Sequence, residues 1–164
     1  MKKIDIASIT DNPFKMIGKD WLLITAGTEE KYNTMTASWG EVGVLWNKNV
    51  ATIYIRPQRY TKEFVDSNDT FTLSVLPEEY RSALQFCGTK SGRDYDKAKE
   101  TGLTPIEVDG SVAFSQARLV LVCKKLYEDV IKPENFIDKS IESNYPIKDY
   151  HTMYIAEITA AYLN

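Results

Sequence analysis

Six segments of the chain alternate apolar with polar residues and are rich in β-branched and aromatic side chains, and this pattern constrains the fold more than any other feature. Alternation with a period of two is typical of β-strands that bury one face. The segments cover about residues 21–26, 33–39, 50–56, 70–76, 117–127 and 152–162. Residues 119–123 are apolar on both faces, which predicts a strand covered on both sides. Asn47-Lys48-Asn49 lies between two apolar runs and predicts a hairpin connection.

The helices that the sequence predicts are few and short. Thr61 is placed to cap a helix that continues to about residue 67, and Pro77 followed by two glutamates begins a second helix. A third is predicted over residues 94–101, and Pro133 opens a last short turn. Strands and helices do not alternate strictly along the chain. The pattern therefore favours a mainly β fold, a β-barrel with a few short helices, over a doubly wound α/β fold.

Length and charge exclude several classes of protein. No linker or repeat divides the 164 residues, which predicts one domain over 1–164. Because the chain has 23 acidic and only 20 basic residues, it has no general positive charge that would attract a nucleic acid. The longest apolar run, 119–123, is far shorter than the roughly 20 residues that span a membrane. Asp5 and Asp11 interrupt any signal-peptide stretch. We expect a cytoplasmic protein that binds a small molecule.

The residue types that hold metals or catalyse acyl transfer are scarce. The single histidine, His151, and two distant cysteines, Cys87 and Cys123, leave no set of metal ligands. The cysteines lie in apolar patterns and are expected in the core. His151 is expected to be structural or at the surface, with contact to a ligand as the alternative. Trp21 and Trp46 are expected to pack.

The segment 33–40 is the first that could carry chemistry. As a strand it presents Thr34, Thr36 and Ser38 on one face, and Asn33, Met35, Ala37 and Trp39 on the other. Hydroxyl groups and an amide can satisfy a planar polar heterocycle, and the methionine and tryptophan can contact its faces. The residues alone leave open a plainer interpretation, an edge strand whose hydroxyl groups face water.

Two cationic segments follow. Arg56 and Arg59 lie where Pro57 ends a strand and Thr61 begins a helix, and arginine is suited to bidentate contact with phosphate. They predict a site for a phosphate monoester, with two solvated arginines at a turn as the alternative. The loop 88–94 is small and cationic, but it lacks the Walker A arrangement and by itself indicates a mobile surface loop. No G-x-G-x-x-G follows a strand, which excludes a Rossmann dinucleotide site.

Taken together, the motifs resemble one known family. The blocks are Asn-Thr-Met-Thr-Ala-Ser-Trp-Gly at 33–40, Arg-Pro-Gln-Arg-Tyr-Thr at 56–61, Cys-Gly-Thr-Lys-Ser-Gly-Arg-Asp at 87–94, Ile-Lys-Pro-Glu-Asn-Phe at 131–136 and His-Thr-Met-Tyr-Ile-Ala-Glu-Ile at 151–158. In this order and spacing they are similar to the flavin reductase-like, FMN-binding split-barrel family, most of all to its flavoredoxin-type branch. The likeness covers residues 15–162.

The resemblance implies a six-stranded, Greek-key split β-barrel that forms a homodimer and binds FMN. It places one group of residues along the isoalloxazine ring and ribityl chain: Asn33, Thr34, Met35, Thr36, Ser38 and Trp39. It places a second group around the phosphate: Arg56, Pro57, Arg59, Tyr60 and Thr61. Ser91 and Lys97 would close the phosphate pocket.

The resemblance also implies an activity. In a flavin reductase, NAD(P)H reduces the flavin by hydride transfer to N5, and the cofactor supplies the redox chemistry. No general acid or base is required, so no catalytic residue is assigned. Two alternatives remain: an FMN-carrying electron-transfer protein that takes electrons from a redox partner protein, and a barrel that binds a ligand without redox chemistry.

Overall fold

The computed structural model describes residues 1–164 and contains every strand that the sequence predicts. The strands are β1 (Lys2–Ile4), β2 (Leu22–Thr28), β3 (Lys31–Ala37), β4 (Gly40–Leu45), β5 (Lys48–Ile55), β6 (Thr70–Val75), β7 (Pro105–Val108), β8 (Ser111–Phe114), β9 (Leu119–Val130) and β10 (Thr152–Leu163). The six predicted strands correspond to β2, β3, β5, β6, β9 and β10. The structure adds β1, β4 and the short β7–β8 hairpin.

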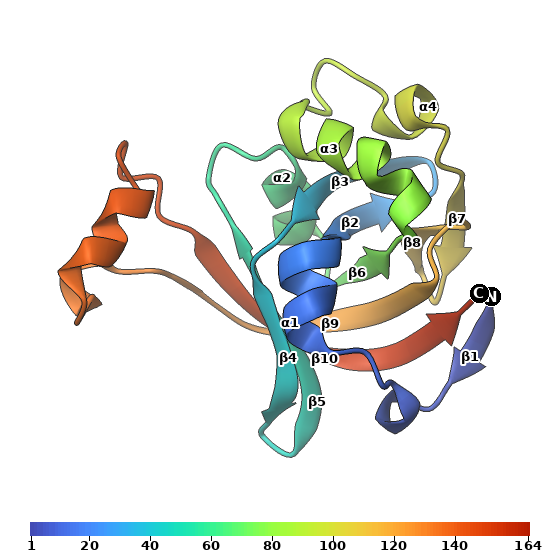
Figure 1. The fold of residues 1–164 in the computed structure, drawn as a ribbon, viewed down its shortest axis with the longest axis horizontal. Helices are drawn as coiled ribbons and strands as arrows, with labels where there is room; N and C mark the ends of the chain where they lie inside the picture. Colours follow the sequence, from blue (N-terminus) through green and yellow to red (C-terminus); the bar gives the residue numbers. More distant parts are fainter.

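One antiparallel sheet forms the body of the molecule, in the order β3-β2-β6-β9-β10-β5-β4, with β1 paired to β10. Its two edge strands, β3 and β4, are consecutive in the chain and are separated only by Ser38 and Trp39. The two edges must therefore come close to each other, and the sheet curls into a barrel that stays open between them (Figure 1). The mainly β split-barrel fold predicted from the sequence is confirmed.

Alternate side chains of the sheet build two separate cores. Leu22, Ile24 and Ala26 of β2 point into the barrel and join a cluster of 22 buried residues. Leu23, between them, points outward and joins a second cluster of 14 residues under the outer helices and the β7–β8 hairpin. The apolar residues 119–123 divide between the two clusters, as expected for a strand covered on both faces.

The helices are α1 (Pro13–Lys15), α2 (Thr61–Ser67), α3 (Arg81–Thr89) and α4 (Lys97–Thr101). A π-helical turn follows α1, and 3-10 turns lie at Ile6–Ser8, Glu78–Tyr80, Pro133–Asn135 and Lys139–Asn144. The second predicted helix begins as the turn Glu78–Tyr80 and continues as α3. None of these helices has the length and apolar content needed to cross a membrane.

Two predicted helix starts need correction. Thr61 is the first residue of α2 and does not cap it; Tyr60 occupies the N-cap position, and its side chain makes no capping hydrogen bond. The third helix begins at Lys97, later than the predicted residue 94, because Asp96 caps it by accepting a hydrogen bond from the amide of Lys99. Gly102, in the left-handed conformation, ends it.

The β4–β5 hairpin turns at Trp46-Asn47, one residue earlier than predicted. Both residues have positive φ angles, 53° and 57°, which is the conformation of a tight two-residue hairpin turn, and Lys48 already pairs with Leu45. Trp46 was expected to pack in the core or at a dimer interface. It is instead half exposed at the tip of the hairpin, with its ring edge toward Tyr127.

Residues 131–151 form an arm between β9 and β10 that extends away from the barrel, at the left of Figure 1. The arm contains two of the 3-10 turns and returns to the sheet at His151. Among its exposed side chains are two large apolar ones, since Ile137 is fully exposed and Ile147 is 75% exposed.

Candidate functional site

Strand β3 supplies the first predicted group of site residues, and the barrel divides them between two faces. Met35 and Ala37 point into the barrel core. Thr34 and Thr36 point outward, and both hydroxyl groups are already used by the protein: Thr34 Oγ1 lies 2.9 Å from Thr25 Oγ1, and Thr36 Oγ1 donates to the carbonyl oxygen of Leu84 at 2.5 Å. Ser38, beyond the end of the strand, is exposed and keeps a free hydroxyl group.

The C-terminal end of β3 borders a hollow of about 180 Å³. It brings together six predicted residues with three others, and its lining comprises Met35, Thr36, Ala37, Ser38, Trp39, Tyr54, Arg56, Arg59 and His151. Tyr54 lies on β5, two residues before Arg56, and no sequence signal distinguished it from a core tyrosine. Trp39 is half exposed beside this hollow, so a broad aromatic face is open to a ligand.

A second hollow, of about 110 Å³, adjoins the first at Arg59. It is lined by Gln58, Arg59, Tyr60, Thr61, Thr89, Lys90, Ser91, Gly92 and Lys97. The start of α2 and the loop after α3 therefore meet, as the two cationic segments of the sequence suggested. The two hollows share Arg59 in their walls, and we refer to them together as the groove: its first end, at β3, is aromatic, and its second end, at the start of α2, is cationic.

The cationic end contains two positive charges that have no acidic partner: Lys97, which is buried, and Arg59, which is half-buried. The Arg59 guanidinium donates to the carbonyl oxygens of Gly88 at 2.8 Å and Cys87 at 3.4 Å. Lys97 Nζ donates to the carbonyl oxygens of Thr34 at 2.8 Å and Cys87 at 3.0 Å. Burial lowers the pKa of Lys97 to about 8, and the charge of Arg59 contributes. Buried charges are normally paired, so these two cations fit an anionic group such as a phosphate.

Asn33 holds the loop of the cationic end against β3 and α2. Its Nδ2 donates to Thr61 Oγ1 at 2.8 Å, and its side chain is buried. A Cβ atom on Gly92 would lie 1.9 Å from Asn33 Oδ1, so only glycine allows the loop to come this close. Asn33 thus lies beside the cationic end, whereas the resemblance placed it along the ring and ribityl chain.

Arg56 takes a different position from Arg59. Its guanidinium donates to Asp149 Oδ2 at 2.6 Å and to the carbonyl oxygen of Asn144 at 2.9 Å, and it stacks over the ring of Tyr145. These contacts tie the arm to the end of β5. The structure therefore places Arg56 at the aromatic end of the groove and not with Ser91 and Lys97, and Pro57 lines neither hollow.

The titratable side chains at the aromatic end keep one protonation state around neutral pH. His151 is buried, with Nδ1 2.9 Å from the hydroxyl oxygen of Tyr145 and its ring centroid 5.3 Å from that of Trp39. Burial, with the charge of Arg56, lowers the pKa of His151 to about 4. Burial also raises the pKa of Tyr54, whose hydroxyl donates to Glu41, to about 12. This end of the groove offers shape and polarity with no proton donor poised near pH 7.

The family model for the flavin reductase like domain matches residues 16–164, nearly the whole chain. The chain belongs to this family. The match includes both hollows, the arm and every strand except β1. The comparison with curated protein sequences finds no match.

Solved structures share the fold. An FMN-binding domain of a flavin reductases-like enzyme from Shewanella baltica superposes with a TM-score of 0.71 at 19% identity, covering 99% of this chain and 76% of that one. A flavoredoxin from Desulfovibrio vulgaris gives 0.69 at 18% identity, with coverages of 100% and 77%. An NADH:FAD oxidoreductase from Streptomyces globisporus, in complex with NAD and FAD fragments, gives 0.65 at 16% identity, with coverages of 88% and 74%.

Proposed function

We propose that this chain acts as a single domain that binds FMN in the groove and is a flavin reductase-like oxidoreductase, in which NAD(P)H reduces the flavin. The observation that carries the proposal is the buried Lys97 beside the half-buried Arg59, two cations that have only carbonyl partners. A phosphate monoester would supply the negative charge that this end of the groove lacks.

The phosphate end would work through Arg59, Lys97 and Ser91. The guanidinium and the ammonium group each have further donors beyond those bound to carbonyl oxygens, because arginine carries five N–H groups and lysine three. The Ser91 hydroxyl accepts a hydrogen bond from the Arg93 amide and keeps its own proton to donate. Tyr60 and Thr61 at the start of α2 close the other side of this hollow.

The ring end would orient a flat heterocycle through apolar and polar contacts. Met35 and Trp39 border it, and the free hydroxyl of Ser38 can donate to a ring oxygen or nitrogen. When bound, the flavin supplies the two-electron chemistry, and the protein supplies binding, orientation and electrostatics. The neutral His151 and the protonated Tyr54 leave the ring end without a general acid or base at neutral pH, which suits a reaction that requires neither.

A second candidate is an electron-transfer protein that takes electrons from a redox partner protein. The half-exposed Trp39 favours it, because the ring end of the groove is open to a protein surface as well as to a nicotinamide. The fold shared with a flavoredoxin is consistent with either activity.

We also propose a homodimer. Val44 and Trp46 on the β4–β5 hairpin and Ile137 and Ile147 on the arm are large apolar side chains that are more than half exposed in the single chain. Exposed apolar groups of this kind mark interaction surfaces. Light scattering on the purified protein tests this proposal, and a monomer at micromolar concentration would contradict it.

Flavin binding and nicotinamide oxidation are tested together. The purified protein is titrated with FMN under fluorescence detection, and NADH or NADPH oxidation is then followed with FMN present. Binding with turnover supports the reductase, whereas binding without turnover but with reduction by a low-potential donor supports the electron-transfer protein. A chain that binds no flavin would leave only the non-redox barrel.

A further inference from the structure

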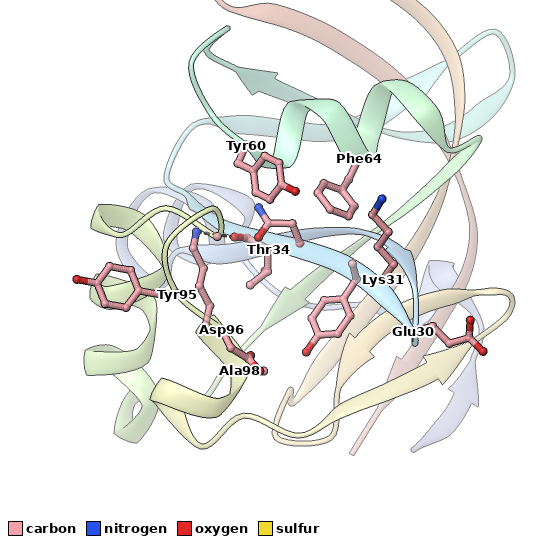
Figure 2. Close-up of a pocket in the computed structure, with 12 residues that line it drawn as sticks. Glu30, Lys31, Thr34, Tyr60, Phe64, Tyr95, Asp96 and Ala98 are labelled. Carbon is pink, nitrogen blue, oxygen red and sulfur yellow. Dashed lines mark hydrogen bonds between the residues drawn. The ribbon is translucent and has the colours of Figure 1, made fainter.

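A separate hollow of about 670 Å³ lies where the π-helical turn, the end of β6 and the start of α3 meet. This volume is within the range of small-molecule pockets, roughly 300–1,000 Å³. Its lining comprises Asp11, Lys15, Lys19, Asp20, Leu76, Pro77, Glu78, Arg81, Leu84 and Arg118. None of these residues lines the groove, and none borders the hollow in Figure 2, which lies among Thr34 of β3, Tyr60 and Phe64 of α2 and Asp96. The proposed function makes no use of this space.

Arg81 is held in place in this hollow with one side of its guanidinium free. Its Nη1 donates to the carbonyl oxygens of Lys19 at 2.7 Å and Asp20 at 3.1 Å, and its guanidinium carbon lies 3.3 Å from the centroid of the Trp21 ring. Its Nε and Nη2 have no hydrogen-bond or ion-pair partner in the protein. These two nitrogens form a side that binds a carboxylate through two parallel hydrogen bonds.

The backbone around Arg81 has features that are common at functional sites. Trp21 has a φ angle of 65°, in the left-handed region that a bulky side chain rarely adopts, and it directly follows the π-helical turn Met16–Asp20. Arg81 is also the first residue of α3, where the helix dipole disfavours a positive charge. An anion bound to the free side of Arg81 would offset this cost.

The charges of the lining leave three groups for a ligand. Four of its seven charged side chains are already paired with each other, Lys15 with Asp20 at 2.8 Å and Arg118 with Asp11 at 2.6 Å. Arg81, Lys19 and Glu78 have no ion-pair partner. Glu78 precedes Arg81 by three residues across the 3-10 turn Glu78–Tyr80, in which side chains three apart lie on the same side. A free carboxylate therefore accompanies the free guanidinium.

We propose that this hollow binds a free α-amino acid with an acidic side chain. Arg81 takes the α-carboxylate, Glu78 accepts a hydrogen bond from the α-ammonium group, and Lys19 binds the side-chain carboxylate. The two negative charges and one positive charge of such a ligand match the three unpaired charges of the lining. Its methylene groups would lie on the apolar residues of the lining, Leu76, Pro77 and Leu84. The inference does not depend on the proposed function, because the two sites share no residue.

The test uses the full chain labelled with 5-fluorotryptophan and titrated with L-glutamate under fluorine NMR. The three tryptophans report on three places: Trp21 lies beneath Arg81, Trp39 at the ring end of the groove and Trp46 at the hairpin tip. The Trp21 signal, assigned with Trp21→Phe, should shift and saturate while the other two stay constant. Saturating FMN should not change the glutamate affinity. A Trp21 signal that did not move, or displacement of glutamate by FMN, would overturn the site.

Two variants at the α-amino and α-carboxylate groups test the assigned contacts. Arg81→Lys keeps the charge and a donor for the two carbonyl oxygens but loses the two-nitrogen side, so L-glutamate should bind at least about tenfold more weakly. Glu78→Gln should weaken L-glutamate roughly two- to fivefold and should not weaken glutarate, which lacks the ammonium group. Glu79→Gln is the matched control, because this neighbouring glutamate is exposed and lies outside the lining. Wild-type affinity in Arg81→Lys would contradict the proposal.

Lys19→Gln tests the choice of an acidic side chain. The wild-type chain should prefer L-glutamate to L-glutamine, and this variant should lose the preference while it binds L-glutamine as before. If the wild-type chain bound both equally, the acidic side chain would be wrong. If inorganic phosphate bound as tightly as L-glutamate, or if Glu78→Gln weakened glutamate and glutarate alike, the hollow would be a general anion site and the amino-acid proposal would fail. All these titrations use the chain without flavin, so a failure of FMN binding would leave their outcome unaffected.

Discussion

Arg59 and Lys97 share one acceptor, the carbonyl oxygen of Cys87, at 3.4 Å and 3.0 Å. Two cations converge there on a neutral group, and neither has a carboxylate within reach. Desolvation by burial lowers the pKa of each group, and the charge of Arg59 lowers the pKa of Lys97 further. Such an arrangement is relieved by an anion from outside the chain, and this expectation can be tested in several ways.

Arg59 and Arg56 should differ in their effects on FMN affinity. Arg59→Ala removes a charged donor from the phosphate end and is expected to weaken FMN by about 1.5–3 kcal/mol, the range for a hydrogen bond to a charged group. Arg56→Ala should weaken FMN less, because its guanidinium is held by Asp149 and Asn144. Fluorescence titration with FMN and with riboflavin measures both effects.

Riboflavin is the control for this pair, since it has the ring and ribityl chain without the phosphate. Arg59→Ala should leave riboflavin affinity unchanged. If Arg56→Ala lost as much FMN affinity as Arg59→Ala, and lost none for riboflavin, the phosphate would lie with Arg56 and the assignment of the two ends would be wrong.

FMN affinity should also fall as the pH rises through about 8, where Lys97 loses its proton. The second ionisation of a phosphate monoester is complete well below this pH, with a pKa near 6, so the ligand's charge stays constant. Only about a tenth of Lys97 stays charged at pH 9, and FMN should bind about tenfold more weakly there than at pH 7. Titrations at several pH values measure this dependence.

The variant Lys97→Met provides the matched comparison. It keeps an unbranched side chain of similar length and removes the titrating group, so its FMN affinity should be low and nearly constant between pH 7 and 9. Riboflavin affinity in the wild-type chain should be constant over the same range. A wild-type profile for FMN that is flat through pH 9 would contradict a role for the Lys97 charge.

Much of the fold could be predicted because it depends on local patterns. The strands that were found, such as β2 and β9, bury at least one face and so alternate or are continuously apolar. The strands that were missed lack this signal: β1 has three residues, and β7 and β8 have four each. The predicted hairpin implied only the end of β4, which is largely exposed. The two-residue turn at Trp46-Asn47 was predicted one residue too late, because tryptophan is not a usual turn residue.

The sequence predicted which segments contribute to the site. It could not predict the hydrogen bonds that the side chains of these segments make with other parts of the protein. Sequence spacing places Arg56 and Arg59 three residues apart, but the turn between them sends one to the arm and the other to α3. The hydroxyl groups of Thr34 and Thr36 looked free because their partners, Thr25 on the neighbouring strand and Leu84 on α3, are brought to them by the fold. Contacts of this kind depend on how the sheet curls, which no local pattern specifies.

Gly92→Ala should disrupt the phosphate end. The new methyl group would lie 1.9 Å from Asn33 Oδ1, so Asn33 must move and lose its hydrogen bond to Thr61. We expect FMN affinity to fall at least tenfold and the melting temperature to decrease, as measured by fluorescence titration and thermal denaturation. Gly18→Ala is the control, because no atom lies within 4 Å of its added Cβ. If Gly92→Ala and Gly18→Ala had the same FMN affinity and the same melting temperature, the close approach of Gly92 to Asn33 would not be needed for FMN binding or for stability.

His151 should make the protein less stable as the pH falls from about 6.5 to about 4. Its pKa is lowered to about 4 in the folded chain, against 6.5 for an ordinary histidine, so the unfolded chain takes up the proton first. Above pH 6.5 both states are neutral and the contribution of His151 is complete. As the pH falls from 6.5 to 4, the free energy of unfolding decreases. Below about pH 4, His151 causes no further decrease in the free energy of unfolding. Hydrogen bonds from Gln58 and Arg56 lower the pKa of the neighbouring Asp149 below its usual value, so its titration falls outside this window.

Urea denaturation of the wild-type chain and of His151→Gln at pH 7, 6, 5 and 4.5 measures the effect. The difference in unfolding free energy between the two proteins should shrink as the pH falls, because only the wild-type chain carries the titrating imidazole. A constant difference across the series would mean that His151 has the same pKa in the folded and unfolded chains, and the lowered pKa assigned to the buried ring would have to be abandoned.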